Sequence, residues 1–554
     1  MPIDEGINVD LQFLLLEVRK QARASLSVID KPSARKIQRI RAREFYVDTL
    51  KNTLVNKSYF NIHNQSPHER QVNYYKSVIT IAANLERCAD FFENIADQMQ
   101  YTNEPQAYQA FELKKFYAAI YKALDATYPA LTSLDIDQAQ TICDIEQLLD
   151  DYYDEAYQQI RKNLKRRYHV DDMLTLLAIV GYLERIGDCF LNIGEAILDI
   201  HVGEKMGIRQ FRDLQKGLEA YQIDIRSMEL EFRPIMNTRS GCRVARITQQ
   251  QNETAPTHLF YKEGESEKVD QEVKGLNLWQ KVYPGRTPKV LWHSSSGDNS
   301  TLLLEYLEGH DLLDILISKP GQIDAALELL TREIPATWLA NKRDKPAKVD
   351  FVGQLTNRRA DIQLVHENLF TENGELDSLL GSARKLQRQL SCPFSTLIHG
   401  DFNVDNIILS VNNDCLHYVD MHRTHYGDYA LDVAVFLVSN YRVPVFSRDI
   451  QQRLNDANLR VFECAREFAR KQKDRQFEAR LALGVFRSLI TSTRFLFDNS
   501  VSTQMYEQAK NLLRELIGKE EKLERFRLSA DYFMRTSSEM AVRGSATPQT
   551  SNVR

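Results

Sequence analysis

The sequence predicts a multidomain protein with an all-α N-terminal half and an α+β C-terminal half. At 554 residues the chain is too long for one compact core and predicts about three folding units. Glycine and proline are scarce, with 22 and 15 residues, and 27% of the residues are charged, a composition that favours helices. The apolar residues change from helical spacing to short strand-like runs near Glu229.

The N-terminal half is predicted to form amphipathic helices throughout. Apolar residues recur three and four positions apart in the segments 11–18, 45–54, 176–183 and 190–198. The half contains an internal repeat, because LERCADFFENIAD at 85–97 matches LERIGDCFLNIGE at 183–195. We therefore expect a helical domain over 1–205, built from two similar units at 8–103 and 104–205, and a linker helix over 206–228.

The C-terminal half is predicted to alternate strands and helices. SVNND at 410–414 separates two apolar runs and indicates the turn of a hairpin. We expect a first lobe over 229–310, a mainly helical second lobe over 311–540, and a disordered tail rich in Ser, Thr and Gly over 541–554. The expected strands are 230–236, 243–250, 257–264, 301–309, the run before Asp401, 407–409 and 415–420, and the expected helical stretches are 267–280, 311–389 and 431–535.

Charge and cysteine content exclude several classes of protein. The net charge of −5 carries no signature of nucleic-acid binding, so no nucleic acid is expected as a partner. The seven cysteines are scattered and never spaced as CxxC, which argues against a disulfide framework and a zinc site. Asp4 and Glu5 stand where a signal peptide needs basic residues, and the longest apolar run, 173–183, is too short to span a bilayer. We therefore expect a cytoplasmic protein without a transmembrane segment.

The strongest chemical signal is the segment LIHGDFNVDNIIL at 397–409. Asp401 stands five residues before Asn406, and Asp420 ends the next apolar run. Phosphoryl transfer needs such a set: an aspartate against the hydroxyl nucleophile, an asparagine that ligates a divalent metal, and a second aspartate that holds the metal on the ATP phosphates. Asp401 is thus the predicted catalytic residue, and His399 either supports the loop or acts as a base. The alternative is that these are ordinary turn and helix-capping residues.

The same segment carries a family resemblance. His399, Asp401 and Asn406 match the signature HGDxxxxN, and residues 230–535 resemble the aminoglycoside phosphotransferase and choline kinase family. The resemblance implies a protein-kinase-like fold of two lobes, ATP as the nucleotide, and Mg²⁺ held by Asn406 and Asp420. It also implies that Asp432 opens and braces a helix after the site.

The resemblance assigns further residues to the nucleotide. Lys262 resembles the lysine that pairs with the nucleotide phosphates, with Glu272, or as the alternative Glu267, as its carboxylate partner. Backbone groups near Glu305 and Leu307 resemble the hinge that bonds the adenine edge. The chain departs from the family pattern where Met421 and His422 follow Asp420 in place of a second acidic residue, and where the loop 237–242 holds a single glycine. It also lacks the DFG and APE sequences of conventional protein kinases.

Each repeat of the helical half carries a stripe of polar side chains. Positions 0, 4, 8 and 11 of the repeat lie within about 80° of one another on a helical wheel. The acidic members are Glu86, Asp90 and Asp97 in one repeat and Glu184, Asp188 and Glu195 in the other, with Asn94 and Asn192 between them. Such an oxygen-rich face suits divalent cations, whereas a solvated face with ion pairs to Arg87 or Arg185 is the alternative.

The repeated ERxxDxxxNI pattern resembles the PhoU family over residues 8–205. This resemblance implies tandem three-helix bundles, an acidic metal site that takes Fe, Zn or another divalent metal, and a role in phosphate homeostasis. The implied protein partners are a phosphate transporter or a sensor kinase, and a second copy of the chain is a further expectation.

The sequence therefore predicts an ATP-dependent phosphotransferase that acts on a hydroxyl group of a small molecule and that carries a PhoU-like domain for regulation or for sensing phosphate status. The alternative is a non-catalytic adaptor or pseudokinase that regulates phosphate transport or signalling through protein contacts. An intact set of Asp401, Asn406 and Asp420 favours the enzyme.

Overall fold

The computed structural model describes residues 5–64, 69–227, 230–235, 241–250, 257–370, 375–410, 415–445 and 447–535. The chain separates into two compact units, Met1–Glu263 and Gly264–Arg554. Within the described ranges, no helix is long and apolar enough to cross a membrane. The predicted tail at 541–554, the loop residues 237–240 and the turn residues 411–414 lie outside these ranges.

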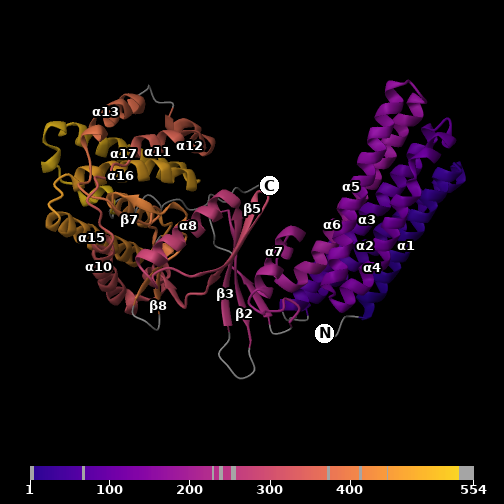
Figure 1. Ribbon diagram of the computed structural model, residues 1–554, viewed down its shortest axis with the longest axis horizontal. Coiled ribbons are helices and arrows are strands. Elements are labelled where there is room, and N and C mark those ends of the chain that lie inside the picture. Colours follow the sequence, from indigo (N-terminus) through magenta and orange to yellow (C-terminus); the bar gives the residue numbers. More distant parts are fainter. Residues whose placement is uncertain are drawn as a thin grey trace, which may run out of the picture. The chain divides into compact units, whose positions relative to one another are not determined.

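Long helices form most of the first unit (Figure 1). They are α1 (Glu5–Asp30), α2 (Ala34–Asn64), α3 (Glu69–Gln98), α4 (Leu113–Ser133), α5 (Ile136–Lys165) and α6 (Val170–Val202). Helices α1 to α3 pack on one another, as do α4 to α6, and α3 packs against α6. This arrangement confirms the predicted all-α half with two three-helix bundles.

The helical core follows from the apolar spacing and from close helix contacts. Leu176, Ile179 and Leu183 of α6 are fully buried, which is the three-and-four periodicity that the sequence shows. A Cβ atom on Gly194 would lie 2.4 Å from the sulfur of Cys143, so a glycine lets α6 approach α5 closely. Helix α7 (Ile208–Glu219) then occupies the predicted linker 206–228.

A five-stranded sheet follows in the sequence, with the strand order β1-β2-β3-β5-β4. Its strands are β1 (Leu230–Pro234), β2 (Arg243–Gln249), β3 (Thr257–Glu265), β4 (Val290–Ser296) and β5 (Asn299–Glu305). β1 and β2 pair antiparallel with Phe232 opposite Ile247, and β2 and β3 pair with Ala245 opposite Tyr261. β4 was not expected from the sequence, because this edge strand buries no residue fully and so lacks an apolar pattern.

The second unit is mainly helical beyond the sheet (Figure 1). Its helices are α8 (Ser266–Val282), α9 (Leu312–Ser318), α10 (Ile323–Ala340), α11 (Phe351–Asn357), α12 (Arg359–Val365), α13 (Glu375–Gln389), α14 (Ala430–Arg442), α15 (Arg448–Lys471), α16 (Phe477–Ser492) and α17 (Asn499–Ile517). Helix α16 is buried along almost its whole length between its neighbours. The mixed α and β content confirms the predicted α+β half.

Short strands carry the loops of the predicted site. They are β6 (Gly309–Asp311), β7 (Thr396–Ile398), β8 (Ile407–Ser410), β9 (Leu416–Tyr418) and β10 (His425–Gly427). β8 and β9 pair antiparallel, with Ile407 opposite Tyr418, which confirms the predicted hairpin. β7 pairs with β10, so the segments before and after the hairpin are also held together.

Candidate active site

The loop after β7 is fixed by one buried carboxylate. Asp432, in the first turn of α14, accepts hydrogen bonds from the backbone N–H groups of His399 and Gly400, each at 2.8 Å. Gly400 has φ +80°, and a Cβ atom there would lie 2.3 Å from the carbonyl oxygen of Arg423. Only glycine fits this turn, which sets the direction of Asp401.

His399 is held within the loop by both ring nitrogens. Its Nε2 lies 2.9 Å from the carbonyl oxygen of Val419, so Nε2 carries the proton and donates it. Nδ1 then accepts the N–H of Asp401 at 3.3 Å. The ring is 1% exposed. These contacts match the loop-supporting alternative for His399, because neither nitrogen is left to take a proton from a substrate.

Asp401 is partly exposed and oriented by two neighbours. Its Oδ1 accepts a hydrogen bond from Nδ2 of Asn403 at 3.0 Å, and its Oδ2 lies 3.0 Å from Nη1 of Arg423. The Asp401 side chain is 18% exposed. A carboxylate held in this way and open to solvent has the geometry of a group that meets a reacting hydroxyl.

Asn406 and Asp420 lie side by side at the ends of the hairpin. Nδ2 of Asn406 donates to the carbonyl oxygen of Asp401 at 2.9 Å, which leaves Oδ1 as the lone-pair donor of that amide. The carbonyl oxygen of Asn406 accepts the N–H of Val419, the residue before Asp420, at 3.1 Å. The structure thus brings together His399, Asp401, Asn406 and Asp420.

Asp420 has an unusual backbone conformation. Its φ of +62° and ψ of +54° lie in the left-handed region, which non-glycine residues adopt seldom and often at functional sites. Its Oδ1 lies 3.2 Å from Nδ1 of His422. The Asn406 amide oxygen and the Asp420 carboxylate are hard oxygen donors, which fit Mg²⁺, an ion that proteins bind through one or two such groups together with substrate phosphates.

The predicted nucleotide residues occupy the sheet and helix α8. Lys262 lies on β3 and is 5% exposed, and Glu272 lies on α8 and is 1% exposed. The alternative Glu267 lies in the first turn of α8, is exposed, and accepts a hydrogen bond from Gln271. Of the two candidates, only Glu272 has the burial typical of a carboxylate in an internal ion pair.

Helix α8 rests on the segment that follows Asp420. A Cβ atom on Gly275 would lie 2.2 Å from the carbonyl oxygen of Met421, and Nε1 of Trp279 donates to Oγ1 of Thr424 at 2.6 Å. The contact at Gly275 leaves no space for a larger residue. The helix that carries Glu272 is therefore positioned by the backbone of the segment that follows Asp420.

The predicted hinge, 302–309, covers the end of β5 and the segment 306–308 that joins β5 to β6. Glu305 ends β5, and its backbone N–H donates to the carbonyl oxygen of Lys289 at 3.0 Å. Leu307 is half-buried in irregular backbone. β6 then begins at Gly309, where a Cβ atom would lie 2.3 Å from the carbonyl oxygen of Leu409, so this glycine allows the hinge to join the hairpin sheet.

Sequence reasoning missed a group of arginines near Asp401. Arg423 pairs with it directly, and Arg358, Arg487 and Arg494 lie close enough to interact electrostatically with Arg423. These residues lie on separate elements and are not regularly spaced in the sequence, so no sequence motif could have predicted the group.

In the helical unit, members of the predicted polar stripe have different partners. Glu86 pairs with Lys51 of α2 at 3.3 Å, Asp97 pairs with Arg41 of α2 at 2.8 Å, and Glu195 accepts the backbone N–H of Ile208 at 3.0 Å. Three of the six predicted metal ligands are therefore engaged in ion pairs or in holding the start of α7.

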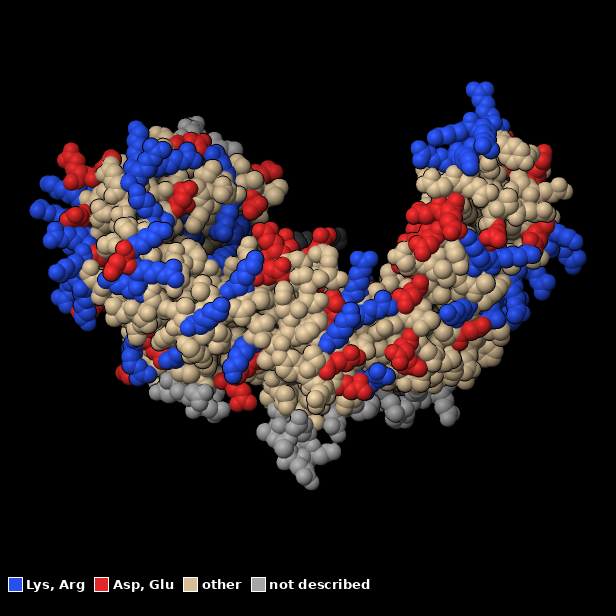
Figure 2. Space-filling view, viewed as in Figure 1, with Lys and Arg blue, Asp and Glu red and all other residues tan. Residues whose placement is uncertain are grey.

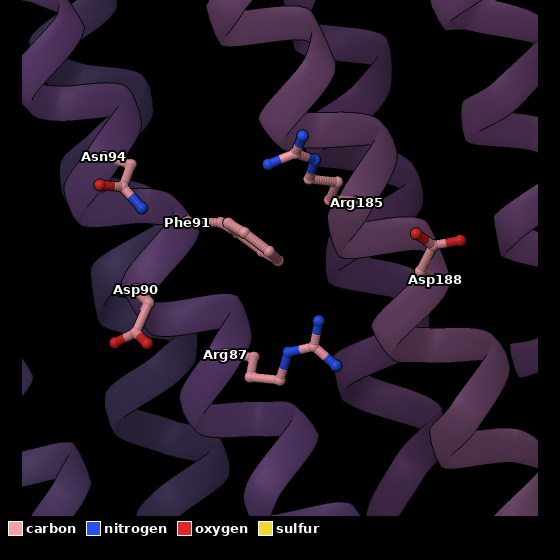
Figure 3. A pocket seen from close by; sticks show the side chains of 6 residues that line it. All are labelled: Arg87, Asp90, Phe91, Asn94, Arg185 and Asp188. Atoms are coloured by element: carbon pink, nitrogen blue, oxygen red, sulfur yellow. The ribbon is translucent and has the colours of Figure 1, made fainter.

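Asp90 and Asp188 line one cavity between α3 and α6 (Figure 3). The cavity has a volume of about 460 Å³, and its other lining residues are Arg87, Phe91, Asn94 and Arg185. The guanidinium groups of Arg87 and Arg185 extend from the two helices into the space between them, beside the Phe91 ring. Repeat-related residues thus meet at the boundary between the two bundles.

Further carboxylates surround these aspartates, and acidic side chains form a patch on the helical unit (Figure 2). Burial and the nearby Glu86 and Glu44 raise the pKa of Asp90 to about 6. Burial and Asp188 raise the pKa of Glu184. Nevertheless, within the described ranges no three His, Cys, Asp or Glu side chains gather closely enough to hold a metal ion. The metal site predicted for the helical half is therefore not supported, and two of its predicted ligands, Glu86 and Asp97, pair with cations of α2 instead.

Two family models match the chain. The model of the PhoU domain matches residues 14–99 and 113–197, and the model of the phosphotransferase enzyme family matches residues 260–468. A PhoU homolog of Thermotoga maritima, a phosphate-specific transport system accessory protein, is 26% identical over 215 residues, which cover 38% of this chain and 88% of that protein.

Solved structures are similar to each half. PhoU from Streptococcus pneumoniae is 18% identical with a TM-score of 0.35 and covers 37% of this chain and 97% of its own. Choline kinase from Cryptosporidium parvum Iowa II is 10% identical with a TM-score of 0.37 and covers 56% of this chain and 97% of its own. Taken with the geometry above, the family matches show that this chain joins a PhoU domain to a domain of the phosphotransferase enzyme family.

Proposed function

We propose that this protein transfers the γ-phosphoryl group of ATP to a hydroxyl group of a small molecule, and that its PhoU domain regulates this transfer in response to phosphate status. The observation that carries the proposal is the joint placement of Asp401, Asn406 and Asp420 through the hydrogen bonds between Asn406 and the backbone of Asp401 and Val419. A family match alone does not require these three side chains to converge.

Asp401 is the proposed catalytic residue. Its carboxylate accepts the proton of the acceptor hydroxyl while the hydroxyl oxygen bonds to the γ-phosphorus. The bond between that phosphorus and the β,γ-bridging oxygen breaks, and ADP leaves. Asn403 and Arg423 hold the carboxylate in position, and His399 keeps the loop in place through the backbone.

The proposed nucleotide site uses the residues that the sequence singled out. Lys262 positions the phosphates, with Glu272 as its carboxylate partner, and backbone groups at Glu305 and Leu307 bond the adenine edge. Asn406 and Asp420 hold Mg²⁺, which when bound neutralises charge on the transferred phosphoryl group. The burial of Lys262 and Glu272 supports this assignment, since buried charges in proteins are paired or serve a site.

The helical domain is proposed as the regulatory part. The Thermotoga maritima homolog is an accessory protein of a phosphate-specific transport system, which supports a phosphate transporter as partner. A sensor kinase is the second partner that we propose, on the family resemblance alone. The cavity lined by Arg87 and Arg185 offers two cationic groups at the boundary of the bundles. The seven cysteines are free thiols, which agrees with the reducing cytoplasm as the proposed location.

Transfer of label from γ-³²P-ATP tests the enzymatic proposal. The full-length protein is incubated with labelled ATP, Mg²⁺ and a small-molecule extract, and labelled products are separated from ATP and inorganic phosphate. We expect a new labelled ester with the parent protein and a reduction of at least 100-fold with Asp401→Asn, because the isosteric amide cannot accept the proton.

Asp405→Asn is the matched control. Asp405 lies in the same loop and is exposed, and it has no part in the proposed mechanism. This variant should keep the parent rate. Equal labelling by the parent protein and Asp401→Asn would remove Asp401 from the reaction, and absence of any labelled ester with bound MgATP would favour the non-catalytic adaptor.

A further inference from the structure

Four arginine side chains from separate segments interact electrostatically with one another near Asp401. Arg423 belongs to a single turn at Met421–Arg423, Arg358 stands between α11 and α12, Arg487 lies on α16, and Arg494 lies in the turn Thr493–Phe495. The packing of α11 on α16 and of α12 on the turn that holds Arg494 brings them together. These positive charges would repel a cationic acceptor.

Arg487 is the most deeply placed of these side chains. It is 6% exposed, and its guanidinium carbon lies 5.9 Å from the centre of the Phe351 ring. Among the described residues, no carboxylate forms an ion pair with Arg487, and its Nε atom has no hydrogen-bond partner. Burial and the charges of Arg358 and Arg423 lower the pKa of its guanidinium to about 9.

A guanidinium with this environment remains protonated at pH 7. The protein therefore contains a buried positive charge without a counter-ion from its own described side chains, an arrangement that destabilises the folded state. Proteins keep such a group where a ligand supplies the opposite charge.

Two further arginines also lack polar or charged partners among the described residues. Nη1 of Arg494 is buried without a hydrogen-bond partner, and Arg358 has no ion pair within the described part of the chain. The acidic groups that interact with the cluster are Asp401, which Arg423 already neutralises, and the exposed Asp361. Three guanidinium groups against one free carboxylate leave an excess of about two positive charges at pH 7.

We propose that Arg358, Arg487 and Arg494 bind an anionic group of the acceptor, and that the acceptor is an alcohol that already carries a phosphate monoester. A phosphate monoester bears about −1.5 to −2 charges at pH 7, which balances the excess, and its oxygens match the planar donor fork of arginine. The inference rests on the proposed phosphotransfer and adds the class of its substrate.

The cluster and the nucleotide residues stand on different elements of the fold. Arg487 and Arg494 follow Asp432 in the chain, and Arg358 belongs to the insert between β6 and β7, whereas Glu272 and Glu305 lie on α8 and β5. Arg423 joins the cluster to Asp401. An anion on the cluster would therefore anchor one end of the acceptor and leave its hydroxyl end for Asp401.

Calorimetric titration of the full-length protein with inorganic phosphate, acetate and choline, at constant ionic strength and with MgADP present, tests the ligand class. We expect phosphate to bind, acetate to bind at least tenfold more weakly, and choline not to bind. Arg494→Gln and Arg358→Gln should each weaken phosphate binding at least tenfold, and the affinity for MgADP should stay within twofold. Arg487→Met provides a third variant, and its folding is checked by its thermal transition.

Arg470→Gln is the matched control. Arg470 lies on α15 with a side chain that is 76% exposed and pairs with Glu467 on the same helix, so phosphate affinity should not change. Phosphate binding that survives all three cluster variants would overturn the inference, as would choline that binds more tightly than phosphate. Loss of MgADP affinity in the cluster variants would also overturn it, because the arginines would then serve the nucleotide.

Turnover separates this inference from the proposed function. ADP release is compared for pairs of alcohols with and without a phosphate ester, such as glycerol 3-phosphate with glycerol and glucose 6-phosphate with glucose. Faster release with the phosphorylated members supports the inference, and faster release with the neutral members overturns it while the phosphotransferase stands. Arginine-dependent phosphate binding in a protein that fails to bind MgATP would support the anion site and overturn the proposed function.

Discussion

Asp432 supports the catalytic loop through two charge-assisted hydrogen bonds to the backbone of His399 and Gly400. In Asp432→Asn one oxygen becomes an amide nitrogen that faces an N–H donor, so one bond is lost and a buried donor is left unsatisfied. We expect a decrease of about 2 to 3 kcal/mol in the free energy of unfolding, measured by urea titration. Asp405→Asn, at an exposed position, should change it by less than about 0.5 kcal/mol. Equal stability of the two variants would contradict the supporting role.

For Arg487 we predict that a substitution raises the free energy of unfolding, in contrast to the Asp432 substitution. Because it carries a buried charge without a partner among the described residues, replacement by a neutral side chain of similar length should stabilise the unliganded protein. We expect Arg487→Met to raise the free energy of unfolding by about 1 to 3 kcal/mol while phosphate binding is lost. A lower free energy of unfolding in this variant would show that the guanidinium already has a stabilising partner.

At the scale of single residues, the sequence predicts the members of the site that share one loop. Asp401 and Asn406 stand in a fixed spacing because both act from the same turn after β7. The arginine cluster was not predictable in this way, since Arg358, Arg423 and Arg494 meet only through the packing of distant elements. The sequence also gave no sign that Arg423 would pair with Asp401.

Among the helices, α3 shows how packed carboxylates set a pH dependence. Asp90 has a pKa of about 6 in the folded protein, raised from about 3.9 by burial and by its acidic neighbours. Between pH 4 and 6 the folded protein therefore binds this proton more strongly than the unfolded chain does. The contribution of Asp90 to the free energy of unfolding falls as the pH rises through this window and is fully lost above it.

Asp90→Asn should therefore stabilise the protein at pH 8 by about 1 kcal/mol after allowance for solvent screening, and the gain should be smaller at pH 5. Urea titrations at the two pH values measure the difference. Asp97→Asn is the control, because it removes the ion pair with Arg41 and should bring no gain. If the gain in the free energy of unfolding over the parent is smaller at pH 8 than at pH 5, the result would contradict the repulsion among these carboxylates.

Helix α8 is expected to be sensitive to its contact with the segment after Asp420. Gly275→Ala would place a methyl group against the carbonyl oxygen of Met421 and should lower the free energy of unfolding by about 1 to 3 kcal/mol. Gly381→Ala, in α13 with open space around the position, should instead stabilise by about 0.5 to 1 kcal/mol. Thermal unfolding compares the two, and similar shifts of both variants would contradict the close contact.

Helices and hairpins were predictable from the sequence where one face is buried. The periodic apolar residues of α6, and the two apolar runs on either side of the segment 410–414, gave the correct elements. The edge strand β4 was not expected, because its mixed burial leaves no alternation. The acidic stripe of α3 was predicted as a shared face, yet the wheel could not show that Lys51 and Arg41 of α2 would cover Glu86 and Asp97.

For the whole molecule, the internal repeat and the HGDxxxxN segment together predicted two different kinds of domain on one chain. Both are present, as a PhoU domain and a phosphotransferase domain. The class of acceptor was not readable from either motif, since it depends on charges that the fold gathers around Asp401.

Binding of MgATP to the full-length protein is the first property that the proposed phosphotransferase must show. Thermal unfolding is recorded with and without MgATP for the parent protein and for Asp420→Asn, a substitution that tolerates the left-handed backbone at this position. Ligand at 100 times its dissociation constant stabilises by about 2.7 kcal/mol, which gives a clear upward shift of Tm. We expect a Mg²⁺-dependent shift in the parent that is lost in Asp420→Asn. No shift in the parent, or an equal shift in both proteins, would contradict it.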